Sequence, residues 1–380
     1  MAGLIAGSLF AAGCQSLPRT PFSYEQLRAA SPDIRMDFAG PAGRNRYIAA
    51  LAAAYRSRRD STFDLLALSG GGADGAYGAG VLAGWSDRGD RPEFEVVTGV
   101  SSGALMAPFA FIGRDGDAEL RRAFTDGRAS NLLQPRWAMA LYGPGLYRQR
   151  PLRQLITSAV TDEVIEAVAA RHRLGARLFV ATTSLDTQSQ VIWDMGALAA
   201  GGGPDRRERF IAILLASASI PGIFPPVLID LDQNGRHVRE LHADGRTTAN
   251  FFVAPERVLL DRTLLGSSSL PGHIWVVVNG SPEPRFAVTS LTGVSVAARG
   301  LDAMMKASTR INLIAAAEFA GSNDLALSVT MIPASIIGAS LDFDRERAMQ
   351  LFDAGREAAA SGQAWAPYPA RSMHTGEFTP

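Results

Sequence analysis

Two stretches of this sequence decide its fold class: Phe63-Asp64-Leu65-Leu66-Ala67-Leu68-Ser69-Gly70-Gly71-Gly72-Ala73-Asp74-Gly75 and Phe94-Glu95-Val96-Val97-Thr98-Gly99-Val100-Ser101-Ser102-Gly103. In each, a short apolar run typical of a buried strand leads into a glycine-rich turn, and a helix-like segment follows. Strands that alternate with helices in this way form a parallel sheet with helices on both faces. We therefore expect an α/β fold of three αβα layers with a mainly parallel sheet, whose carboxyl edge carries both turns and the chemistry.

The second turn has the spacing Gly99-x-Ser101-x-Gly103. A serine on a tight strand-to-helix turn sits in a strained backbone conformation, and its neighbours two positions away must be nearly free of side chain. The helix expected over residues 102–112 would direct its amino-terminal N–H groups and positive dipole end at the serine oxygen. The pattern predicts Ser101 as a nucleophile. An ordinary turn capped by Ser101 or Ser102 would look the same, so the motif alone is weak evidence.

The first turn offers the second component of acyl transfer. Gly70, Gly71 and Gly72 expose backbone N–H groups that can closely approach a developing oxyanion, because no side chain shields them. We therefore assign the oxyanion hole to these three glycines.

The same turn also fits the dinucleotide-binding pattern Gly-x-Gly-x-x-Gly at Gly70, Gly72 and Gly75. That pattern expects an acidic residue at the end of the next strand, where it holds the ribose hydroxyls. Here Glu93 and Glu95 instead open the strand. A dinucleotide-binding oxidoreductase is therefore the second hypothesis.

Together with a later Asp244-Gly245, these two turns resemble the patatin-like phospholipase family of bacteria. Its pattern is a Gly-Gly-Gly oxyanion loop, a Gly-x-Ser-x-Gly nucleophile and an Asp-Gly pair. The segment Ala216-Ser217-Ala218-Ser219-Ile220-Pro221-Gly222-Ile223-Phe224-Pro225-Pro226 is similar to the stretch that precedes the aspartate strand in that family, and the resemblance extends over about residues 63–280. It implies a lipid acyl hydrolase of the phospholipase A or esterase type, a serine hydrolase acting through a Ser101–Asp244 dyad.

Two residues depart from the family pattern. Asp74 stands where the family loop usually carries Arg or Lys, and Arg246 follows Asp244-Gly245 where a small residue is usual. We expect the Asp74 carboxylate to disfavour anionic phospholipid and Arg246 to offset part of that effect. Neither residue supplies the nucleophile, the base or a backbone donor.

An aspartate has an unperturbed pKa of about 3.9, so it serves as a base only in a dry, preformed site. A Ser-His-Asp triad is the competing arrangement. Of the histidines, His242 shares a strand face with Asp244 by period-two spacing, and we expect it to support the site through hydrogen bonds rather than act as the base. The five histidines tested for this role are His172, His237, His242, His273 and His374.

Composition limits the classes of function. The chain has 380 residues, 47 % hydrophobic residues and equal numbers of cationic and acidic side chains, 37 of each. The chain has no excess of positive charge, so its composition does not predict binding to nucleic acid. We also expect no metal or organic cofactor. The length fits a hydrolase domain over residues 42–360 with a tail over residues 361–380.

The amino terminus resembles that of a bacterial lipoprotein. Residues 1–13 form a small, apolar signal-like segment, and Ala11-Ala12-Gly13-Cys14 resembles a lipoprotein cleavage box, in which Cys14, the only cysteine, is acylated. No Lys or Arg precedes the apolar run, so the basic part of a signal peptide would lie upstream of Met1. Residues 14–41 would then form a linker to a lipid anchor. Gln15 resembles the sorting pattern of outer-membrane lipoproteins, which predicts a cell-envelope protein facing the periplasm, with a membrane-lipid substrate.

A catalytically silent, lipid-anchored binding protein on the same scaffold is the third hypothesis. Hydrolysis of a short acyl ester separates the first hypothesis from the other two. Flavin or nicotinamide absorbance of the purified protein would identify the oxidoreductase.

Overall fold

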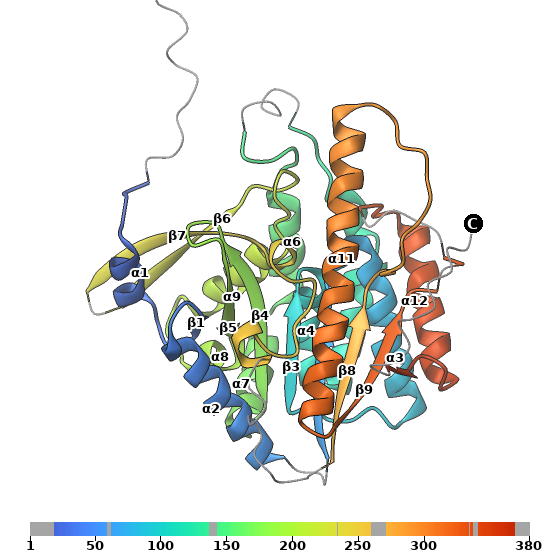
Figure 1. Ribbon diagram of the computed structural model, residues 1–380, viewed down its shortest axis with the longest axis horizontal. Coiled ribbons are helices and arrows are strands. Elements are labelled where there is room, and N and C mark those ends of the chain that lie inside the picture. Colours follow the sequence, from blue (N-terminus) through green and yellow to red (C-terminus); the bar gives the residue numbers. More distant parts are fainter. Residues whose placement is uncertain are drawn as a thin grey trace, which may run out of the picture.

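The computed structural model describes residues 19–58, 62–136, 143–233, 235–259, 271–333, 335–336 and 341–368. Helices flank a central sheet (Figure 1). The strands are β1 (Arg35–Asp37), β2 (Phe63–Leu68), β3 (Val96–Val100), β4 (Arg177–Ser184), β5 (Ser189–Asp194), β6 (Val227–Gln233), β7 (Arg236–Asp244), β8 (Gly272–Val278), β9 (Leu325–Met331) and β10 (Ala366–Pro367). The α-helices are α1 (Tyr24–Ala30), α2 (Pro41–Ser57), α3 (Gly75–Arg88), α4 (Ser102–Ile112), α5 (Asp117–Thr125), α6 (Arg150–Ala159), α7 (Asp162–Arg173), α8 (Met195–Ala200), α9 (Arg206–Ser217), α10 (Glu256–Leu259), α11 (Gly293–Ser322) and α12 (Arg345–Ala360). Short 3₁₀ turns are η1 (Gly72–Asp74), η2 (Arg114–Gly116), η3 (Arg128–Asn131) and η4 (Gly245–Thr247).

The centre of the sheet is parallel. Its strand order is β1-β5-β4-β3-β2-β8-β9-β10, and the pairs from β4 to β9 run parallel. Both margins are antiparallel, because β5 returns along β4 and β10 pairs with β9. The mainly parallel αβα fold predicted from the sequence is confirmed.

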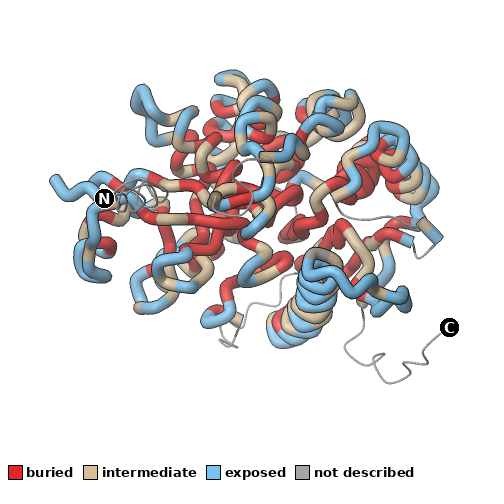
Figure 2. Tube along the Cα trace, turned by 90° about the horizontal axis from the view of Figure 1, so that it is seen from above, coloured by how far each residue is buried: buried red, intermediate tan, exposed pale blue. Residues whose placement is uncertain are grey.

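The alternating direction of side chains along β2 explains why the hydrophobic core has one layer on each face of the sheet. Leu66 and Leu68 pack into the core beneath α3, α4, α9 and α12, whereas Leu65 and Ala67 face the core beneath α2 and α11. Since successive side chains of a strand point to opposite faces, the four consecutive apolar residues Leu65-Leu66-Ala67-Leu68 are what a strand covered on both sides requires. Buried residues accordingly concentrate along the central sheet in Figure 2.

A hairpin brings a distant part of the chain to the carboxyl end of this sheet. Strands β6 and β7 pair antiparallel, and the last residues of β7 pair with β4, where Asp244 lies opposite Thr182. Strand β3, which ends just before Ser101, pairs with the preceding residues of β4 along the same edge, because β5 occupies the opposite edge of β4. The arrangement places the ends of β3 and β7 close together.

The expected domain limits need correction at both ends. Residues 14–41 are not a free linker from Arg19 onward, because β1 pairs with β5 and the Arg35 side chain is fully buried. The tail expected over residues 361–380 belongs to the domain up to Tyr368, since β10 pairs with β9 and the Trp365 ring contacts the Trp85 ring. The signal segment and Cys14 lie outside the described residues.

Within the described parts of the chain, no helix has the length and apolar character needed to cross a membrane.

Candidate active site

Ser101 occupies the turn between β3 and α4 in a conformation that few side chains adopt. Its φ is 56° and its ψ is −123°, a strained combination for a residue other than glycine. Gly103 shows why the neighbouring positions must be small: a Cβ atom there would lie 2.3 Å from the carbonyl oxygen of Leu68. The turn therefore closes tightly against the end of β2.

The structure brings Ser101 and Asp244 together. The Ser101 hydroxyl donates a hydrogen bond to Asp244 Oδ2 at 2.6 Å, across 143 positions of sequence. Both residues are almost inaccessible, with exposed fractions of 2 % and 1 %. Burial raises the pKa of Asp244 to about 6, although the Arg246 charge and the Ser101 hydrogen bond act in the opposite direction. A raised pKa makes this carboxylate a better proton acceptor than a solvated aspartate.

The segment after α9 supports both residues through its own polar groups. The Ser101 amide N–H donates to Ser217 Oγ at 3.0 Å, and the Ser217 hydroxyl donates to the Ala181 carbonyl at 2.7 Å. Two residues later, the Ser219 carbonyl accepts from the Asp244 amide at 2.8 Å. The Ala-Ser-Ala-Ser stretch thus holds the backbones of both residues from one side.

The glycine loop lies directly beside Ser101. A Cβ atom at Gly70 would be 2.9 Å from the Ser101 Cβ. The Gly70 amide is already used, because it donates to the Asn250 carbonyl at 3.0 Å. Among the described residues, the Gly71 and Gly72 amides donate to no protein acceptor. Of the three glycines proposed for the oxyanion hole, Gly71 and Gly72 therefore have N–H groups available.

Asn279, at the end of β8, fixes the start of this loop. Its side-chain amide donates to the Ser69 carbonyl at 2.7 Å, and its backbone N–H donates to Ser69 Oγ at 2.8 Å. Its Oδ1 accepts from the Gly78 amide at 3.1 Å. Sequence reasoning missed Asn279, Asn250 and Ser217, because each acts through contacts between segments far apart in the chain.

Asp74 and Arg246 take roles that the sequence did not reveal. Arg347 of α12 donates to Asp74 Oδ1 at 2.6 Å, and both side chains are largely buried. The Asp74 carboxylate is therefore compensated by an ion pair, and we expect a smaller effect on an anionic substrate than the sequence suggested. The Arg246 side chain lies across Gly70, and its Nε is buried without a hydrogen-bond partner in the described residues.

An apolar pocket opens at Ser101. It runs between α4, α5, α6, α9 and α12, and Ser101 and Ser102 are the only residues with polar side chains in its described lining. Leu105, Phe109, Leu152 and Leu214 represent the rest of the wall. Ser102 Oγ is buried there with no hydrogen-bond partner in the described residues. A long apolar chain fits such a pocket, because the described wall is apolar apart from these two serines.

A known protein family matches this chain. A family model described as patatin-like phospholipase matches residues 66–257, about half of the chain, and this range contains both Ser101 and Asp244.

The chain belongs to the patatin-like phospholipase family.

No curated protein matches the chain. Among solved structures, the crystal structure of VipD from Legionella pneumophila is similar, with a TM-score of 0.32 and 13 % sequence identity over 82 % of this chain and 68 % of VipD.

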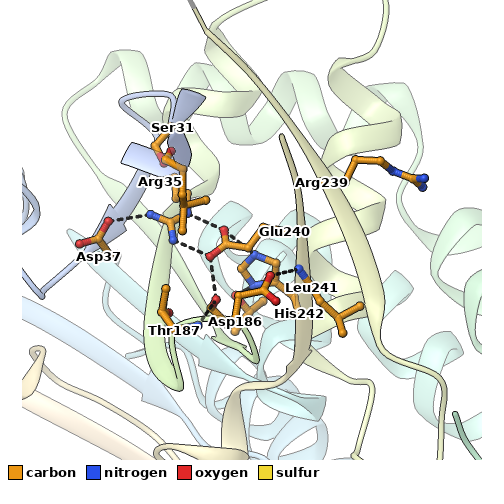
Figure 3. Close-up of polar contacts among 12 residues, drawn as sticks. Ser31, Arg35, Asp37, Asp186, Thr187, Arg239, Glu240, Leu241 and His242 are labelled. Carbon is orange, nitrogen blue, oxygen red and sulfur yellow. Dashed lines mark hydrogen bonds and ion pairs between the residues drawn. The ribbon is translucent and has the colours of Figure 1, made fainter. Parts of the chain in front are cut away.

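Among the described histidines, His242 is the nearest in sequence to Asp244 of this patatin-like domain. His242 is fully buried, and both ring nitrogens are engaged: Nδ1 with Thr182 Oγ1 at 2.9 Å and Nε2 with Glu240 Oε2 at 2.9 Å. Glu240 is itself paired with Arg35 at 2.7 Å, as Figure 3 shows. None of the four histidines in the described residues hydrogen-bonds Ser101 or Asp244, and His374 lies outside them.

The glycine turn also lacks the space that a dinucleotide would need. The Arg246 side chain fills the region over Gly70, and Asn279 fills that over Gly71, where a pyrophosphate would approach the backbone. No group of three or more metal-ligating side chains occurs in the described residues.

Proposed function

We propose that the protein hydrolyses carboxylic esters of lipids, with Ser101 as nucleophile and Asp244 as general base. One observation carries this proposal: a strained serine, hydrogen-bonded to a buried aspartate at 2.6 Å, opens onto an apolar pocket. Family membership supports the reaction class.

In the first half-reaction, Asp244 accepts the hydroxyl proton while Ser101 Oγ attacks the ester carbonyl carbon. The carbonyl oxygen becomes an oxyanion, which the free Gly71 and Gly72 amides stabilise. Collapse of the tetrahedral intermediate breaks the bond to the alcohol oxygen, and Asp244 returns the proton to the leaving alcohol. The acyl group stays on Ser101 as an ester.

In the second half-reaction, water takes the place of the alcohol. Asp244 removes a proton from water, the resulting hydroxyl attacks the acyl carbonyl, and the same amides hold the oxyanion. Collapse releases the fatty acid and restores the Ser101 hydroxyl with the proton from Asp244. The preformed geometry lowers the barrier in both steps because little reorganisation is needed.

Ser102 provides a matched control for testing the nucleophile. Ser101→Ala should abolish ester hydrolysis and leave the fold intact, since the substitution only removes a hydroxyl. Ser102→Ala should retain most of the activity, because Asp244 is bonded to Ser101 and the Ser102 hydroxyl has no partner in the described residues.

The measurement is hydrolysis of a short acyl ester and of phospholipid, with circular dichroism as the check on folding. A fluorophosphonate probe should label Ser101 alone. Undiminished hydrolysis by Ser101→Ala would remove this assignment. A wild-type protein that neither hydrolyses esters nor reacts with the probe would be the catalytically silent binding protein.

A further inference from the structure

The segment between β8 and α11 exposes apolar side chains to an unusual degree. Phe286, Val288 and Leu291, which we call the apolar tip, have exposed fractions of 89 %, 89 % and 99 %. Eight of the 13 exposed large apolar side chains in the described residues lie between positions 286 and 314. Scattered single residues of this kind are normal on protein surfaces, but a cluster indicates an interaction surface.

Helix α11 continues this surface. None of its described side chains before Thr309 is buried, and Val296 and Met304 are exposed by 52 % and 67 %. Only the later part of the helix, with residues such as Leu313 and Phe319, packs on the sheet. In Figure 1 the amino-terminal half of α11 and the segment before it rise beyond the carboxyl ends of the strands, the edge that carries Ser101.

The charges around the tip favour an anionic surface. Residues 281–310 contain four cations, Arg285, Arg299, Lys306 and Arg310, against two carboxylates, Glu283 and Asp302, which leaves a net charge of +2. The whole chain has no net charge. Apolar side chains flanked by cations match a layer of acyl chains beneath anionic headgroups.

Hydrogen bonds connect this helix to the catalytic loop. Asn250 donates through its side-chain amide to Thr309 Oγ1 at 2.7 Å and through its backbone to Asn312 Oδ1 at 3.0 Å. The Asn250 carbonyl in turn accepts from the Gly70 amide. These bonds fix the position of α11, and of the exposed surface that it carries, relative to Ser101.

We propose that the apolar tip and the amino-terminal half of α11 form a membrane-docking surface, which inserts Phe286, Val288 and Leu291 between anionic lipids and positions the Ser101 pocket at the bilayer. The choice of a lipid surface as the occupant rests on the proposed function. Docking itself does not require catalysis, so the two proposals can be tested apart.

Binding is measured on the full chain carrying Cys14→Ser and Ser101→Ala, so that neither an acyl anchor nor lipid hydrolysis contributes. The probes are vesicles of phosphatidylglycerol with phosphatidylethanolamine, compared with vesicles of phosphatidylcholine alone. We expect binding to the anionic vesicles that weakens with added salt. In the same background, Phe286→Ser/Val288→Ser/Leu291→Ser should lower the vesicle affinity about 100-fold, because partial burial of three apolar side chains is lost.

Leu174→Ser is the matched control for Leu291→Ser. Leu174 is also an exposed leucine, at 53 %, but it lies just before the amino end of β4, at the opposite edge of the sheet. The Leu174→Ser substitution should leave vesicle binding unchanged. With Ser101 restored, the triple variant should hydrolyse a soluble short-chain ester at the wild-type rate but vesicle phospholipid more slowly.

Equal vesicle affinity of the triple variant and its parent would overturn the docking proposal even if ester hydrolysis depends on Ser101. A parent protein that is dimeric in solution, and becomes monomeric in the triple variant without a change in vesicle binding, would also overturn it and assign the surface to a second copy of the chain. If the parent protein binds vesicles but ester hydrolysis does not depend on Ser101, only the proposed function would be overturned.

Discussion

Asp244 and Arg246 show how neighbouring side chains tune a base. Desolvation favours the neutral carboxyl and raises the Asp244 pKa, whereas the Arg246 charge favours the carboxylate. Asp244 Oδ1 also accepts from the Arg246 amide at 2.8 Å, which leaves Oδ2 for Ser101. The residue after the Asp-Gly pair, where the family usually has a small side chain, therefore acts on the proton acceptor.

The pH dependence of hydrolysis tests this balance. Since the base must be ionised, kcat/KM should rise with pH through about 6 and then level off. Arg246→Met removes the charge that favours ionisation, so the rise should move to higher pH by about one unit or more. Asp244→Asn should lower the rate by about 10²- to 10⁴-fold at every pH. His242→Gln should cost less, and a larger loss there than in Asp244→Asn would make a histidine the base.

At the scale of elements, a buried charged network joins the amino-terminal strand to the hairpin that carries Asp244. Arg35 of β1 is bonded to both carboxylate oxygens of Glu240 on β7, at 2.7 and 2.8 Å, and to Asp37 (Figure 3). Although desolvation acts to raise the pKa of Glu240, hydrogen bonds and charge from His242 and Arg35 outweigh it and hold that pKa well below its usual range. Strand β1 is thus coupled to β7 although it is hydrogen-bonded to β5 in the sheet.

Removing one partner of this network should be costly. Arg35→Met leaves the Glu240 carboxylate buried without the guanidinium that bonds both of its oxygens, so we expect a loss of about 3 to 5 kcal/mol in the free energy of unfolding. Arg35→Met/Glu240→Met should recover part of that loss, because neither member of the fully buried Arg35–Glu240 pair is left without the other. Urea denaturation measures both variants. A single variant as stable as the wild type would show that water or rearrangement replaces the pairing.

At the scale of the whole molecule, the contacts of Arg19 limit the length of the tether that an acylated Cys14 would provide. Arg19 is already bound to the domain through the Asp186 carboxylate and the Arg239 carbonyl. Only residues 15–18 separate it from Cys14, and four extended residues span at most about 14 Å. An anchor at Cys14 would therefore hold the domain close to its membrane.

Cell fractionation tests that placement. We expect the protein to be found with membranes and to carry acyl groups on an amino-terminal Cys14, because several acyl chains together bind more firmly than one. Cys14→Ser should release it to the soluble fraction or block its processing. Mass spectrometry of the amino terminus decides the question, and an unmodified Cys14 in a soluble wild-type protein would eliminate the anchor.

The local sequence pattern was sufficient to locate the elements that have a strong apolar pattern. Strand β2 and helix α4 lie at the residues expected for them, since a mostly apolar run that is buried on both faces is visible within a few residues of chain. The resemblance to the family also singled out Ser101 and Asp244, which the structure brings within a hydrogen bond.

Other features depend on contacts between segments that are distant in sequence. Strand β1 has only three residues, and its place became evident only from its pairing with β5. The first half of α11 is exposed rather than buried, so its sequence need not show the amphipathic repeat by which a packed helix is predicted. The Asp74–Arg347 ion pair spans 273 positions, and the pocket gathers residues from five α-helices. The sequence by itself therefore determined the αβα class and the candidate catalytic pair, whereas the pocket, the compensated charge and the exposed surface of α11 were decided by the tertiary structure, because sheet order and helix packing bring those residues together.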